Sequence, residues 1–267
     1  MSAGPAIFRS ANGESPLVIS FPHVGTGLPS EIAAALTSRG REVEDTDWHV
    51  HRLYAFARDQ GAACIEARLS RYAVDLNRPP DDTALYPGQA STGLCPTQTF
   101  DGEGLYAGAL PDATEIARRR ERYWAPYHAA LKDLLAAAQR RHGFAVLLDA
   151  HSIRSVVPRL FDGRLPDINV GTNDARSCDP RLADAVMGRL AAQQQFSHVL
   201  NGRFKGGYIT RHYGNPAGGV HALQIELAQR GYMDESGREF EPARAAALID
   251  VLRGIVARLL EFQPAAR

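Results

Sequence analysis

The stretch Ala145-Val146-Leu147-Leu148-Asp149-Ala150-His151-Ser152-Ile153-Arg154 decides the fold. Its first four residues are apolar and follow Gly143, a residue type that often ends helices, so the run predicts a buried strand. Asp149 and His151 are two positions apart and share one face of an extended chain, and Arg154 comes just past the strand end. Ligands of α/β folds bind beyond the carboxyl ends of strands. We expect an acid, an imidazole and a guanidinium in one crevice; a buried polar cluster that satisfies itself is the alternative.

Working outward, strand patterns and helix patterns alternate along the chain. The apolar and β-branched runs predict strands at 17–21, 62–67, 69–76, 165–172 and 220–227. Apolar residues at helical spacing, caps and prolines predict helices over 50–61, 112–141 with a kink at Pro126, 179 onward, and 242–262. Two stretches rich in glycine, 79–111 and 199–219, read as loops. This order predicts a single α/β domain over 1–267, with a mostly parallel or mixed central sheet flanked by helices.

Composition narrows the class of protein. The 267 residues carry 30 basic and 30 acidic side chains and are 45% hydrophobic, which is ordinary for a globular protein and argues against nucleic acid as a partner. We find no signal-peptide pattern and no apolar run long enough for a membrane span. Cys64, Cys95 and Cys178 are odd in number and far apart. We therefore expect a cytoplasmic protein with reduced thiols, no membrane partner and an oligomeric state that the sequence leaves open.

Polar residues at predicted strand and helix ends suggest a metal site. His23, His151 and one of the acids Asp45 and Asp47 make the two-imidazole, one-carboxylate ligand set of a catalytic zinc, with Glu226 available as general base. HExxH and zinc-finger spacings are absent. The alternatives are that the two aspartates cap a helix and that Glu226 is a satisfied buried acid. We expect His49 and His51 to be surface or core residues, and His128, His142 and His198 to be surface residues, with no role in the site.

Other chemistries fit less well. The chain lacks the phosphate-loop pattern and the GxSxG elbow, and no local cysteine signature supports a thiol hydrolase. The substrate side is indicated by cations near strand ends and in the glycine-rich loops, where planar guanidinium groups bind carboxylates. These cations predict a small dianionic substrate, unless they are solvent-facing charges; they are Arg71, Arg78, Arg154, Arg203, Lys205 and Arg211.

Six stretches together resemble one family. They are 20–26 (SFPHVGT), 45–49 (DTDWH), 70–80 (SRYAVDLNRPP), 85–88 (LYPG), 149–155 (DAHSIRS) and 201–211 (NGRFKGGYITR). Over about 17–234 the chain is similar to N-formylglutamate amidohydrolases, also called deformylases, of bacterial histidine breakdown. The resemblance implies a phosphorylase/hydrolase-like α/β fold related to zinc carboxypeptidases, and hydrolysis of N-formyl-L-glutamate to formate and L-glutamate.

Carried over residue by residue, the resemblance implies one Zn²⁺ per chain, or another divalent metal, held by His23, Asp47 and His151. Thr26 stands where the carboxypeptidase HxxE pair has its acid, so that ligand must come from elsewhere in the chain. Glu226 is implied as the base that passes the water proton to the leaving nitrogen, and Arg154 as a catalytic cation. The substrate-binding set comprises Arg71, Asn77, Arg78, Arg154, Lys205 and Arg211, with Asp149 behind His151.

Two other functions stay open at this point. The first keeps the zinc site but gives it another substrate, as an N-acyl amino acid hydrolase or a carboxypeptidase-like peptidase. The second is a metal-binding or ligand-binding regulatory protein without turnover. Release of formate from N-formylglutamate distinguishes the three.

Overall fold

Three buried strands form the centre of the molecule, which we describe from a computed structural model over residues 6–84 and 92–265. They are β2 (Leu17–Phe21), β4 (Ala145–Ile153) and β7 (Val220–Ala228). All three run parallel, with Ser20 of β2 opposite Asp149 of β4, and His151 of β4 opposite Glu226 of β7. Their carboxyl ends therefore meet at one edge of the sheet.

Four further strands complete a seven-stranded sheet in the order β1-β3-β2-β4-β7-β5-β6. They are β1 (Phe8–Ala11), β3 (Ala63–Ala67), β5 (Ile168–Gly171) and β6 (His198–Leu200). β1 pairs with β3 and β5 with β7 in antiparallel fashion, while β3 runs parallel to β2 and β6 to β5. The mixed central sheet is the one that the sequence predicts.

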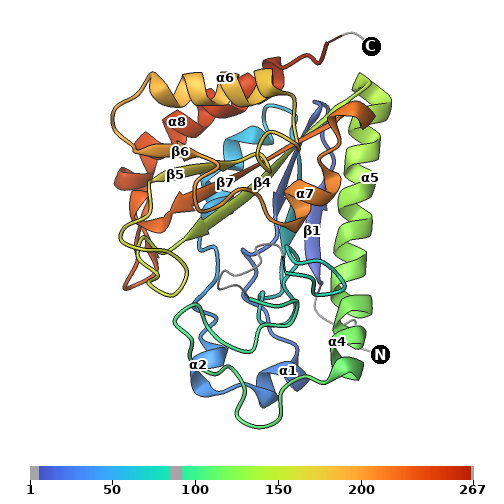
Figure 1. The fold of residues 1–267 in the computed structure, drawn as a ribbon, viewed down its shortest axis with the longest axis vertical. Coiled ribbons are helices and arrows are strands. Elements are labelled where there is room, and N and C mark those ends of the chain that lie inside the picture. The colour runs from blue at the N-terminus through green and yellow to red at the C-terminus, as the bar shows by residue number, and fades with distance from the viewer. Residues whose placement is uncertain (1–5, 85–91, 266–267) are drawn as a thin grey trace.

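Helices cover both faces of this sheet (Figure 1). One face packs against α3 (Val50–Leu53), α6 (Pro180–Ala191) and α8 (Pro242–Glu261), the other against α5 (Ala125–His142) and α7 (Tyr208–Tyr213). In β7, Leu223, Ile225 and Leu227 join the α6/α8 core. Gln224 and Glu226 therefore face the other side, as their alternation predicts.

The long helix expected over 112–141 is present but interrupted. It consists of α4 (Ala113–Arg119), a π-helical turn η2 (Arg120–Trp124) and α5. Asp112 caps it by accepting a hydrogen bond from the Glu115 N–H at 2.8 Å. Pro126 has no N–H to donate to the preceding turn, and the widened turn lies directly before it.

Three local predictions are wrong. Residues 69–76 form turns rather than a strand, with Ser70 and Asp75 side chains accepting hydrogen bonds from the N–H groups of Tyr72 and Asn77. The helix expected over 50–61 is only α3 followed by a 3₁₀ turn, η1 (Ala55–Ala57). The second glycine-rich loop contains α7, because Ile209 is fully buried and anchors that turn of helix.

Short elements fill the connections. These are α1 (Ser30–Ala35), α2 (Ser38–Arg41), η3 (Pro216–Gly218), η4 (Gln229–Gly231) and the hairpin of β8 (Met233–Asp234) with β9 (Glu239–Phe240). Cys64, Cys95 and Cys178 are all buried and free. Within the described part of the chain, each helix is too short or too polar to span a bilayer.

Candidate active site

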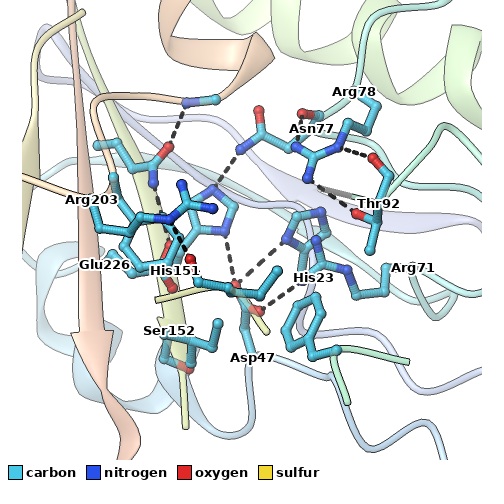
Figure 2. A pocket seen from close by; sticks show the side chains of 16 residues that line it. His23, Asp47, Arg71, Asn77, Arg78, Thr92, His151, Ser152, Arg203 and Glu226 are labelled. Atoms are coloured by element: carbon cyan, nitrogen blue, oxygen red, sulfur yellow. Dashed lines mark hydrogen bonds and ion pairs between the residues drawn. The ribbon is translucent and has the colours of Figure 1, made fainter. Parts of the chain in front are cut away.

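Two histidines and one aspartate meet beyond the carboxyl ends of β2 and β4 (Figure 2). His23 follows β2 by two residues, His151 lies near the end of β4, and Asp47 sits on the turn before α3. One ligand atom from each lies within 4.8 Å of the others, and all three side chains are buried. The structure therefore brings together the three residues that the sequence suggests as metal ligands.

The donor atoms fit a cation. Asp47 Oδ2 lies 2.8 Å from His151 Nδ1 and 3.7 Å from His23 Nδ1. His23 Nδ1 is buried and has no hydrogen-bond partner among the residues that the structure describes. Two imidazole nitrogens and one carboxylate oxygen that converge in this way match the ligand set of a catalytic zinc site. Asp45 does not share this position, because its Oδ2 accepts hydrogen bonds from Tyr72 Oη and the Phe100 N–H, both at 2.7 Å.

A second carboxylate stands behind each imidazole. His23 Nε2 lies 2.7 Å from Asp75 Oδ1, and His151 Nε2 lies 3.0 Å from Asp149 Oδ2. A carboxylate on the far nitrogen orients a ligating histidine and makes its near nitrogen a better donor. Asp149 shares one face of β4 with His151, as the sequence predicts. Asp75 lies in residues 69–76, which form turns where the sequence predicts a strand.

These contacts shift the pKa values strongly. Burial lowers the pKa of His151, but Asp149 and Asp47 outweigh it and raise that pKa well above its usual value. Burial raises the pKa of Asp47, but the hydrogen bond from His151 and the nearby His23 imidazole outweigh it and leave it lowered. The pKa of Asp75 is also lowered, by Arg71 and His23 acting against burial. Three buried aspartates face one buried guanidinium, so a divalent cation would offset their excess charge; they are Asp47, Asp75 and Asp149.

Glu226 stands beside the three converging residues, on the strand next to His151. Its Oε2 lies 3.3 Å from Gln224 Nε2, and Gln224 Oε1 accepts a hydrogen bond from the Gly207 N–H at 2.7 Å, which sets the orientation of that amide. Burial raises the pKa of Glu226 to about 8. A buried carboxyl group with a pKa near neutrality is suited to accept and return a proton.

Three guanidinium groups line the same pocket. Arg71 is bound to Asp75 at 2.7 Å and lies 3.7 Å from Asp47, so it belongs to the buried charge cluster. Arg78 is held by Thr92, through its Nε to the carbonyl at 2.7 Å and its Nη2 to the hydroxyl at 3.1 Å. Arg203 donates to the Leu160 carbonyl at 2.6 Å. Figure 2 shows Arg78 and Arg203 approaching the pocket from opposite sides.

Other cations of the predicted set lie outside the lining. Arg154 binds Asp101 at 2.9 Å, and Lys205 binds Asp174 at 3.1 Å. Arg211 donates from Nε to the Gly206 carbonyl at 2.7 Å. Asn77 is at the pocket, but its amide is 2.9 Å from His151 Nε2 and 3.0 Å from Asp149, so it supports the imidazole.

Several lining residues were not singled out from the sequence. Thr92 and Phe100 lie in the first glycine-rich loop, where no periodicity marks them. Gln224 could have been found, because it shares a strand face with Glu226. The stretch 85–88, which contributed to the family resemblance, lies outside the described residues.

Comparison with known proteins gives one consistent result. Residues 15–233 match the family model described as N-formylglutamate amidohydrolase. An N-formylglutamate deformylase of Pseudomonas aeruginosa is 52% identical over 250 residues, which is 93% of this chain and 92% of that protein. A Pseudomonas putida protein of the same name is 51% identical over 225 residues, 84% of each chain.

Comparison with solved structures gives the same family. The crystal structure of an N-formylglutamate amidohydrolase from Ralstonia eutropha superposes with a TM-score of 0.80 at 30% identity, over 96% of both chains. An Agrobacterium tumefaciens protein reaches a TM-score of 0.71 at 19% identity, also over 96% of both chains, and shares the fold.

Proposed function

This chain belongs to the N-formylglutamate amidohydrolase family, and from that premise we propose that it hydrolyses N-formyl-L-glutamate to formate and L-glutamate. The observation that carries the proposal is a single pocket that combines a cation-type ligand set, a buried carboxyl group and three guanidinium groups. The relatives named as deformylases support the choice of substrate. We further propose that the reaction serves histidine breakdown, as the resemblance to the family implies, and that it takes place in the cytoplasm, where thiols such as the three free cysteines stay reduced.

His23, Asp47 and His151 would hold one divalent cation, with zinc as the proposed metal. Such an ion supplies a Lewis acid for the formyl oxygen and makes water acidic enough to react near neutral pH. Asp75 and Asp149 keep the far nitrogens of the two imidazoles engaged, so that the near nitrogens point into the pocket.

Glu226 is the proposed general base. As a carboxylate it takes a proton from the attacking water, the oxygen of which bonds to the formyl carbon. It then returns that proton to the glutamate nitrogen as the carbon–nitrogen bond breaks, giving formate and the free amine. Its pKa of about 8 suits both transfers. Gln224 holds the carboxyl group in position between the two proton transfers.

Arg78 and Arg203 are the proposed partners of the two substrate carboxylates, since they line opposite sides of the pocket. Arg71 takes a different part: it is bound to Asp75 and Asp47 and offsets charge around the ligands. Three cations that the sequence predicts to bind the substrate do not contact it in this proposal, because other partners hold them outside the pocket lining. They are Arg154, Lys205 and Arg211.

The test is a substrate comparison. We expect N-formylglutamine to have a kcat/KM about 10-fold to over 100-fold below that of N-formylglutamate, because one arginine then loses a charged hydrogen-bond partner worth about 1.5–3 kcal/mol. Lysine in place of Arg78 or Arg203 lowers kcat/KM for N-formylglutamate, since an ammonium group does not reproduce the planar fork. The variant at the side-chain carboxylate also discriminates less between the two substrates.

N-acetylglutamate and a short peptide ending in glutamate complete the set. If either of them, or the neutral amide, is hydrolysed as well as N-formylglutamate, the function is that of a broader acylase or peptidase. Absence of turnover on every substrate with a cation bound would indicate a binding protein.

A further inference from the structure

Asp47 lies on a turn before α3, outside any helix or strand. Its own N–H donates to the His23 carbonyl at 3.0 Å. Two residues later His49 has φ +59°, a left-handed conformation that side chains disfavour. The position of the Asp47 carboxylate therefore depends on what fixes this turn from outside.

The backbone carbonyls on both sides of Asp47 are bound by side chains from residues 229–240, which comprise η4, β8 and β9. Gln229 Nε2 donates to the Thr46 carbonyl at 3.1 Å, and Tyr232 Oη donates to the Trp48 carbonyl at 2.7 Å. Gln229 is 2% exposed and Tyr232 fully buried. The contact to Thr46 is buried and the contact to Trp48 is partly buried. The Thr46 carbonyl also accepts a hydrogen bond from the Trp48 N–H at 2.8 Å, whereas the Trp48 carbonyl accepts from Tyr232, so loss of the Tyr232 hydroxyl removes that donor.

The same two side chains also reach the strand that carries the second histidine. Tyr232 Oη is 2.7 Å from Ser152 Oγ, and Gln229 Nε2 is 3.5 Å from that oxygen. A phenol has one proton and a carbonyl can only accept, so Tyr232 donates to Trp48 and accepts from Ser152. Ser152 is the direct neighbour of His151. One buried phenol thus ties the turn of Asp47 to the strand of His151.

A third contact comes from the hairpin. His49 Nε2 lies 2.9 Å from the Arg238 carbonyl, and Arg238 Nη1 donates to the Glu42 carbonyl at 3.0 Å. Residues 229–240 therefore hold the turn at Thr46, Trp48 and His49, which are on either side of the ligand. These restraints add to local ones, in which Thr46 Oγ1 donates to the Val43 carbonyl at 2.6 Å and Trp48 Nε1 donates to the Glu44 carbonyl at 3.2 Å.

We propose that Tyr232 and Gln229 are positioning residues of the cation site, which set the distance between Asp47 and His151 by binding the carbonyls that flank Asp47. This inference rests on one part of the proposed function, the binding of a cation at the site. Loss of outer-shell support typically weakens metal binding by about 10-fold to 100-fold. We expect a loss of that size when the Tyr232 hydroxyl is removed.

The experiment compares two buried tyrosines of one core. Tyr232→Phe removes a hydroxyl with two partners; Tyr54→Phe removes a hydroxyl that is buried and has no hydrogen-bond partner among the described residues. The Kd for Zn²⁺ is measured by competition with a chelator on the full-length protein, and the visible spectrum of bound Co²⁺ reports ligand geometry. Tyr232→Phe should raise the Kd about 10-fold or more and alter the spectrum, while Tyr54→Phe leaves both unchanged.

Gln229→Met provides a second variant of similar shape, and it decides the matter if Tyr232→Phe does not fold. Unchanged Kd and spectrum in both variants would overturn the proposal, as would an equal loss in Tyr54→Phe. Wild-type protein that binds the cation but does not turn over N-formylglutamate would refute the proposed reaction and leave these positioning residues in place. Wild-type protein that binds no cation would refute both.

Discussion

Two buried histidines in different regions of the molecule, His151 and His128, have pKa values that are shifted in opposite directions. His151, at the carboxyl end of β4, faces Asp47 and Asp149, and its pKa is raised well above the usual value. His128, on α5, is stacked on Trp124 with ring centroids 3.8 Å apart, and burial lowers its pKa to about 3. The two side chains are equally inaccessible, 3% and 5% exposed. The neighbours, and not burial itself, decide which protonation state is stable.

The aromatic residues around His128 also hold in place the segment that contacts His151. His128 Nε2 binds the Leu76 carbonyl at 2.9 Å, and Trp124 Nε1 donates to the Arg78 carbonyl at 3.0 Å. Between them lies Asn77, whose amide contacts His151. A neutral imidazole suits this task, because it can donate to the carbonyl from Nε2. Its Nδ1 lies 3.0 Å from Tyr213 Oη, which donates to the His128 carbonyl at 3.2 Å. His128, expected from the sequence to lie at the surface, is thus a buried structural residue.

The largest expected effect is on metal content, which should fall in variants of His151 but not in a variant of His128. Purified protein should hold about one divalent cation per chain and lose activity with a chelator. His151→Ala or His23→Ala should lose the cation and about 10³-fold in kcat/KM, since metal catalysis contributes several kcal/mol and 1.36 kcal/mol is a decade. His128→Gln, which can still donate to Leu76, should retain the cation. Metal analysis that finds full occupancy in the alanine variants would contradict the site.

The next effect concerns the acid next to His151. Glu226→Gln keeps the shape of the side chain but cannot accept a proton. We expect the cation to remain bound and kcat to fall by roughly 10²-fold or more, the usual scale of general base catalysis. Rapid-quench or steady-state measurement of formate release gives kcat, and metal analysis is the control. Turnover at the wild-type rate would remove Glu226 from the mechanism.

The smallest effect is on stability against pH. Below its unfolded pKa of about 6.5, the His128 ring takes up a proton in the unfolded chain but not in the folded one, whose pKa is about 3. Stability is therefore lost as pH falls from about 6.5 towards 3, by up to about 1.4 kcal/mol per pH unit. His128→Gln lacks this proton, so its unfolding free energy should decline less between pH 7 and 5.

Urea unfolding of the wild-type protein and of His128→Gln at pH 7, 6 and 5 gives the difference in their unfolding free energies. Effects of acid on the cation site are common to both proteins and cancel in this difference. Nitrogen-15 NMR of the imidazole gives an independent check. A His128 ring that titrates near pH 6.5 in the folded protein would show that its surroundings do not exclude the proton.

Local pattern was enough for much of the fold. The apolar runs around Leu17–Phe21 and Ala145–Ile153 are strands where expected. The period of two in the run at 220–227 correctly predicts that Gln224 shares a face with Glu226. Prediction was wrong where side chains compete with the backbone. In 69–76 the side chains of Ser70 and Asp75 bind nearby N–H groups and make turns, which a count of apolar residues does not detect.

By itself the sequence determined the central strands, the acid behind His151 and the two histidines that converge, because strand geometry and the edge rule of α/β sheets act over a few residues. Only the tertiary structure decided which cations reach the pocket: Arg203 lines it, while Arg154 is held by Asp101. It also decided how Asp47 is held, through Tyr232, a residue 184 positions from Trp48. Such contacts follow from the packing of distant segments, and no period or motif within either segment encodes them.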